Sequence, residues 1–98
     1  MKPLRTETLL PLAAKYIWWK TPEEAVLRPD RIITQVMNIG DYDDVQALVH
    51  QVDEAYLHEI LQGAEAGQFS EKSWAYWHYR LGLSEPGCVP ALPQRRVV

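Results

Sequence analysis

Three residues of the chain have the types and the spacing of a metal site. His50, Glu54 and His58 recur at every fourth position, which on one continuous helix would place their side chains along a single face. Imidazole and carboxylate groups are ligands for zinc and related ions. Asp53, however, is typical of a helix N-cap, so a helix boundary is predicted between His50 and Glu54. We therefore expect solvated polar side chains here, with no bound metal and no other cofactor.

Catalytic motifs are not found elsewhere in the sequence. His58 and Glu59 begin like a zinc-protease motif, but Gln62 stands where the second histidine belongs. The sequence contains no glycine-rich phosphate loop and no nucleophile elbow. Cys88 is the only cysteine, which excludes a disulfide within the chain and a cysteine-based zinc site. We expect a protein that is not an enzyme.

The elements that would position these residues are predicted from helix start and stop signals. Five positions carry residues preferred at or beside a helix N-terminus, and a glycine follows three of the predicted helices. Apolar residues recur at helical spacing between these signals. The five start positions are Thr21, Pro29, Asp41, Asp53 and Ser70.

These signals predict an all-α fold, a compact single domain of about five short helices over residues 6–83. Trp74 and Trp77 lie on the apolar stripe of the last predicted helix, so both are expected in the core. Residues 84–98 contain several prolines and have no periodicity. They are predicted to form a mobile or extended tail.

Charge is distributed unevenly along the chain. The net charge is −3, but residues 41–65 contain seven carboxylates and no lysine or arginine. Four of the seven stand at or near predicted helix starts, where capping and the helix dipole account for them. Glu59 lies beyond any first turn. We expect Glu54 and Glu59 to face a basic surface on a protein partner, where complementary charge favours fast and specific association.

Residues 41–63 are predicted to form two helices with almost no loop between them, an arrangement similar to a helix-turn-helix. The second of these helices carries Glu54 and Glu59 but no lysine or arginine, and the phosphate backbone of DNA would repel it. Contacts to DNA would have to come from Lys72, Arg80 and the arginines of the tail. Nucleic acid is therefore not the expected partner, and a DNA-binding transcriptional regulator is the alternative function.

Trp18 and Trp19 are adjacent in the sequence. Neighbouring side chains point in different directions on a helix and on a strand, so the two cannot enter one core in the same way. We expect one of them to pack against Trp74 and Trp77, and the other to be exposed as a contact for a partner. Both are candidate partner-binding residues.

The order of these features is similar to that of a small bacterial family of domains of unknown function. Its members show Phe-Trp-Asp, then Gly-Asp-x-x-Asp, then a Phe-Trp pair. The corresponding positions here are Trp18 to Lys20, residues 38–45 (NIGDYDDV) and Tyr76-Trp77. Genes of this family often lie beside nucleotidyltransferase-type abortive-infection toxins. The resemblance therefore implies an antitoxin-like or accessory role with a protein partner, and it carries no catalytic residues.

The hydropathy of the chain predicts its compartment. No apolar run approaches the length of a membrane span, so no membrane partner is expected. The apolar stretch at residues 9–14 is shorter than the core of a signal peptide, and Glu7 stands where that core would begin. We expect a soluble, cytoplasmic protein, and the sequence leaves a homodimer open.

Overall fold

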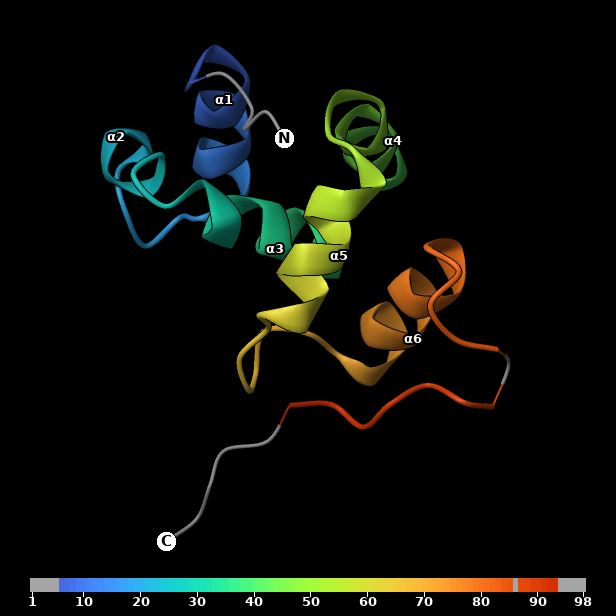
Figure 1. Cartoon of the computed structure of the whole chain (residues 1–98). Coiled ribbons are helices and arrows are strands. Elements are labelled where there is room, and N and C mark those ends of the chain that lie inside the picture. Colours follow the sequence, from blue (N-terminus) through green and yellow to red (C-terminus); the bar gives the residue numbers. More distant parts are fainter. Residues whose placement is uncertain (1–5, 86, 94–98) are drawn as a thin grey trace, which may run out of the picture.

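The computed structural model describes residues 6–85 and 87–93, and this part of the chain consists of helices without strands (Figure 1). The predicted all-α class is confirmed. The number of helices in the described residues is six rather than about five, because a helix at the N-terminus precedes those that the start signals predicted. The helices are α1 (Thr6–Tyr16), α2 (Pro22–Ala25), α3 (Pro29–Ile39), α4 (Tyr42–Gln51), α5 (Glu54–Gln62) and α6 (Glu71–Arg80).

The additional helix, α1, contains Pro11 in its interior. A proline there removes one backbone hydrogen bond and clashes with the preceding turn, at a cost of about 3 kcal/mol. The helix persists because its apolar face is buried: Leu9 and Ala13 are 2% and 0% exposed, and Ile17 continues the same face just beyond the last turn. Tertiary packing therefore overrides the local signal against a helix.

The four predicted N-caps, at the starts of α2, α4, α5 and α6, are confirmed. Thr21 forms a capping box with Glu24 at the start of α2. Asp41, Asp53 and Ser70 each accept a hydrogen bond from the backbone N–H three residues later, at 2.9, 2.8 and 3.2 Å. These bonds satisfy backbone donors that a helix leaves unpaired at its N-terminus, and they define where α4, α5 and α6 begin.

Helix α3 lies at the centre of the fold, between α1 and α2 on one side and α4, α5 and α6 on the other (Figure 1). Its neighbouring residues Ile32 and Ile33 are both fully buried but belong to different clusters. Ile32 packs with α1 and α2. Ile33, Val36 and Met37 pack with the larger cluster that α4, α5 and α6 complete. Because two faces of α3 are buried, one helix joins the two halves of the core.

The predicted burial of the tryptophans of α6 is confirmed. Trp77 is 1% exposed, and its indole N–H donates to the backbone carbonyl of Met37 at 2.8 Å. Trp74 is 7% exposed and donates to the carbonyl of Pro90, also at 2.8 Å. Both indoles therefore contribute apolar area to the core without leaving a buried donor unpaired.

The tail makes a turn at Gly87, and residues 88–93 then run beside α6 without helix or strand (Figure 1). Besides the bond from Trp74 to Pro90, Val89 and Leu92 pack against the larger core cluster. Arg95 and Arg96, two residues considered above for DNA contacts, lie outside the described residues.

Candidate functional site

The stretch Tyr16-Ile17-Trp18-Trp19 divides into a buried half and an exposed half. Tyr16 and Ile17 are 4% and 5% exposed, whereas Trp18 and Trp19 are 69% and 58% exposed. The expectation that one of the two would pack against the tryptophans of α6 is wrong. Helix α1 ends at Tyr16, and the positions that continue its buried face are taken by Tyr16 and Ile17, so the next two side chains project from the surface.

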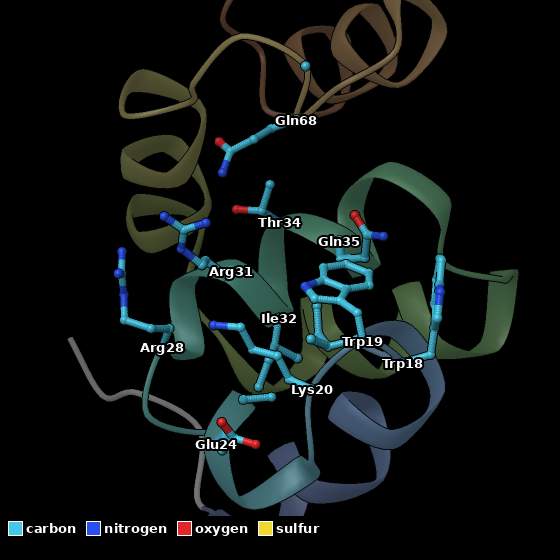
Figure 2. Close-up of a pocket in the computed structure, with 13 residues that line it drawn as sticks. Trp18, Trp19, Lys20, Glu24, Arg28, Arg31, Ile32, Thr34, Gln35 and Gln68 are labelled. Carbon is cyan, nitrogen blue, oxygen red and sulfur yellow. The ribbon is translucent and has the colours of Figure 1, made fainter.

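The two exposed indoles contact each other, with ring centroids 5.0 Å apart and planes at 89°. This edge-to-face arrangement is one that aromatic pairs prefer. Together they border a cavity of about 420 Å³, which we call the tryptophan groove (Figure 2). Buried apolar side chains of Ile17, Ala25 and Ile32 also line it. The chain thus exposes a large aromatic surface directly beside an apolar hollow.

Three cationic side chains, those of Lys20, Arg28 and Arg31, also line the tryptophan groove. In the view of Figure 2 the two arginines lie on one side, the indoles on the other, and the lysine between them. The groove contains one carboxylate, Glu24, which accepts a hydrogen bond from the Thr21 hydroxyl within the capping box. The groove is therefore locally cationic in a chain whose net charge is negative.

The charges of the groove are only partly compensated. Arg28 lies 3.5 Å from the Asp30 carboxylate, and both side chains are about half exposed, so the pair contributes little to stability. Lys20 and Arg31 form no ion pair with the part of the chain that the structure describes. These two cations are available to an anionic ligand.

A second hollow, of about 260 Å³, continues from the first and shares Arg28 and Arg31 with it. We call it the acidic groove because Glu59 and Glu65 line it beside the shared arginines. Tyr56 also lines it, and the pKa of its phenol is raised by burial first and then by the negative charges of Asp30 and Glu59. The sign of the charge therefore changes from one end of this continuous surface to the other.

The predicted partner residue Glu59 thus lies in the acidic groove, exposed on α5. Glu54 is exposed in the first turn of the same helix and lines neither groove. Their expected contact with one basic partner surface stays a prediction. Their surroundings differ, because Arg28 and Arg31 stand near Glu59 within the groove.

Two further carboxylates of residues 41–65 form ion pairs within the chain, at its surface. The Lys15 ammonium contacts Asp41 at 2.6 Å and Asp44 at 2.8 Å. The Tyr16 hydroxyl donates to Asp44 at 2.5 Å and accepts from the backbone N–H of Asp41 at 3.1 Å. This network ties the end of α1 to the start of α4. The seven carboxylates of residues 41–65 therefore do not form one uncompensated face.

The same contacts alter the ionisation of the network. Hydrogen bonds to Asp41 and then to Asp44 raise the pKa of Lys15. The hydrogen bond from Lys15, followed by that from the Asp44 backbone N–H, lowers the pKa of Asp41. Burial, and then the bond to Asp44, raises the pKa of Tyr16. The three shifts favour the protonated lysine, the charged Asp41 carboxylate and the protonated phenol, which together are the state in which the network is complete.

The helix boundary predicted within the candidate metal site is confirmed. His50 lies on α4, whereas Glu54 and His58 lie on α5, and the cap Asp53 separates the two helices. Within residues 6–85 and 87–93, no three side chains of histidine, cysteine, aspartate or glutamate are grouped so that they could hold a metal ion.

The cations considered for DNA contacts lie on α6. Lys72 is exposed in its first turn. Arg80 donates to the Tyr76 hydroxyl and lies over the Trp77 ring, 5.7 Å from its centroid. Arg80 is therefore held against its own helix.

The arginines of the tryptophan groove were missed by sequence reasoning. Arg28 and Arg31 flank the start of α3, a spacing that by itself is typical of a solvated helix end. Lys20 belongs to the loop between α1 and α2. Only packing of α2 against α1 and α3 brings these charges to the two indoles.

Comparison of the chain with models of protein families, with curated proteins and with solved structures yields no match. The longest helices, α1 and α3, have 11 residues, and none in the described ranges has the length and hydropathy needed to cross a bilayer.

Proposed function

We propose that this protein is a non-catalytic protein-interaction module that contacts its partner through the tryptophan groove. The observation that carries the proposal is the exposure of Trp18 and Trp19 together, at the edge of a hollow and beside Arg28 and Arg31. Tryptophan and arginine are the residues most enriched among those that dominate binding energy at protein interfaces. A surface with both types around a concavity suits an anchor side chain from a partner.

The partner class follows from the resemblance described above, which implies an antitoxin-like role beside a nucleotidyltransferase-type toxin. In this proposal Glu54 and Glu59 meet basic residues of the same partner. Both are exposed on α5, where opposite charge would speed association and discriminate between partners. Such a module inhibits or regulates by occupying a surface, and it needs no reactive group of its own.

A DNA-binding regulator is the second candidate, favoured by the two bases exposed on α6, Lys72 and Arg80. Two observations weigh against it. Arg80 is engaged by Tyr76 and lies over the Trp77 ring, and α5 presents carboxylates where a recognition helix would need cations. The protein-interaction module therefore has the stronger support.

The experiment that tests the module compares two variants of the full chain. Trp18→Ala combined with Trp19→Ala removes the proposed contact, and Tyr42→Ala removes an equally exposed aromatic ring on α4. Proteins retained from an extract of the source cells are identified, and the leading one is purified and titrated against each variant. The proposal expects at least a tenfold loss of affinity for the tryptophan variant and none for Tyr42→Ala. Equal affinity for both variants, or tight binding to duplex DNA that depends on Lys72, overturns it.

A further inference from the structure

The chemistry of the two grooves specifies a ligand more closely than the presence of exposed tryptophans does. We infer that the tryptophan groove binds a short acidic segment of a partner protein, one in which neighbouring carboxylates precede an apolar or aromatic side chain. This inference rests on the proposed function and names the chemistry of the segment that the module takes.

The acidic character of the segment follows from the cations that line the tryptophan groove. Lys20, Arg28 and Arg31 reach the same cavity from the α1–α2 loop, the residue before α3 and the first turns of α3. Arginine presents a planar fork of donors that matches a carboxylate, so a pair of arginines suits two carboxylates in succession. Arg31 and Lys20 have no ion pair within the described residues to give up when a ligand binds.

The apolar character of the rest of the segment follows from the side of the groove that the two indoles form. Trp18 and Trp19 present 69% and 58% of their surface to solvent, and Ile17, Ala25 and Ile32 line the hollow beside them. An apolar side chain inserted here would remove both its own surface and that of the indoles from water, which is the main source of affinity at an interface. The volume, about 420 Å³, lies in the range of pockets that bury most of a small ligand. It therefore suits a segment rather than a folded domain.

The negative charge of the acidic groove favours a peptide over a nucleic acid as the ligand. Glu59 and Glu65 stand immediately beyond the shared arginines. A single-stranded nucleic acid carries a charge on every phosphate, so a strand that stacked on the indoles and continued along the surface would meet these carboxylates. A peptide can confine its acidic residues to the cationic end and place a lysine or arginine over Glu59. Charge complementarity along the whole surface therefore favours a peptide.

The experiment titrates the full chain with a blocked synthetic peptide that contains lysine followed by Glu-Glu-Leu-Phe, so that the lysine can reach Glu59 when the carboxylates lie on the arginines and the apolar residues on the indoles. Binding is followed by tryptophan fluorescence, since the probe contains none and Trp18 and Trp19 are the exposed indoles. The control probes are the Gln-Gln-Leu-Phe twin, an eight-nucleotide oligothymidine and inorganic phosphate. We expect the acidic peptide to bind saturably and at least tenfold more tightly than its glutamine twin, and to bind more weakly at high salt. We expect no binding of the oligothymidine or of phosphate.

Variants assign the binding to the groove. Arg28→Gln combined with Arg31→Gln should weaken peptide binding at least tenfold, whereas Arg80→Gln, an arginine on α6, should leave it unchanged. Circular dichroism verifies that each variant is folded. Equal binding of the acidic peptide and its glutamine twin, tighter binding of the oligothymidine, or no binding of any probe overturns the inference.

The two proposals fail in different ways. If the tryptophan variant loses the cellular partner while the arginine variant keeps it, the groove is the contact but its ligand is not acidic. If the peptide binds at Arg28 and Arg31 and the partner is unaffected by loss of Trp18 and Trp19, the groove recognises acidic segments but the proposed module function is overturned.

Discussion

The protein contains two pairs of tryptophans, of which one pair is buried and the other is exposed. Trp74 and Trp77 are 7% and 1% exposed, and each indole N–H is bonded to a backbone carbonyl. Trp18 and Trp19 are 69% and 58% exposed and contact each other. The buried pair is spaced by three residues within one helix, whereas the exposed pair is adjacent and follows the end of a helix. Position relative to a helix face, rather than residue type, separates a structural tryptophan from a candidate binding residue.

The two pairs of tryptophans also have different energetic roles. An indole in the core stabilises the fold by the area it removes from water and by the contacts it makes. An exposed indole contributes little to folding, but it retains its area for a partner.

Replacing the buried pair should affect stability most. Trp77→Ala and Trp74→Ala are each expected to lower the free energy of unfolding by about 3–5 kcal/mol, because a large cavity opens in the core. Urea unfolding followed by circular dichroism measures this change. Values within about 1 kcal/mol of the natural protein for both variants would contradict the role of α6 as a core helix.

Removing the tail should have an intermediate effect. A chain ending at Ser84 is expected to keep its helices but to lose about 1–3 kcal/mol of stability, since Val89 and Leu92 no longer cover the core. Thermal unfolding measures the loss. In a Trp74→Phe background the truncation should cost less, because the bond from Trp74 to Pro90 is already absent. If the truncation lowers the stability equally in both backgrounds, Trp74 and the tail are not coupled.

The network at the start of α4 should give a pH-dependent effect. The pKa of Asp41 is lowered in the folded protein, so its contribution is present above the unfolded value of about 3.9 and is lost as the pH falls through the folded value. Asp41→Asn keeps a capping oxygen but removes the charge. The variant should be the less stable protein at pH 7, and the two stabilities should converge as the pH falls through the folded pKa of Asp41. Urea unfolding at several pH values measures the difference in stability between the two proteins. A difference that does not change with pH would contradict the role of the Asp41 charge.

The exposed pair should give the smallest effect. Trp18→Ala and Trp19→Ala are each expected to change the free energy of unfolding by no more than about 0.5 kcal/mol, as is usual for surface positions. Urea unfolding at pH 7 measures this. A loss as large as that of Trp77→Ala would mean that the indoles hold α1 and α2 together, and the distinction between the two pairs would fail.

Much of the fold could be predicted because helix boundaries depend on near neighbours. The caps at Thr21, Asp41, Asp53 and Ser70 each act on a backbone N–H three residues away, so their chemistry is readable in a short window of sequence. Helix α1 was not predicted, because Pro11 is a local signal against it and the burial that compensates is not local.

The candidate site was less predictable than the fold. Trp18 and Trp19 stood out as binding candidates by composition, yet the expectation that one of them would be buried failed because Tyr16 and Ile17 already complete the core there. The carboxylates of residues 41–65 resembled one acidic surface in sequence. Lys15, 26 residues before Asp41, binds two of them in the folded protein.

The sequence by itself determined the helical class, the starts of helices α2 to α6 and the burial of the α6 stripe, since each depends on residues within one or two turns of one another. Only the tertiary structure decided which tryptophans are exposed and which charges surround them. Lys20, Arg28 and the indoles meet because α2 packs against α1 and α3. Glu59 joins Arg31 in the acidic groove although 28 residues separate them. Such contacts result from the packing of whole helices, which no local pattern encodes.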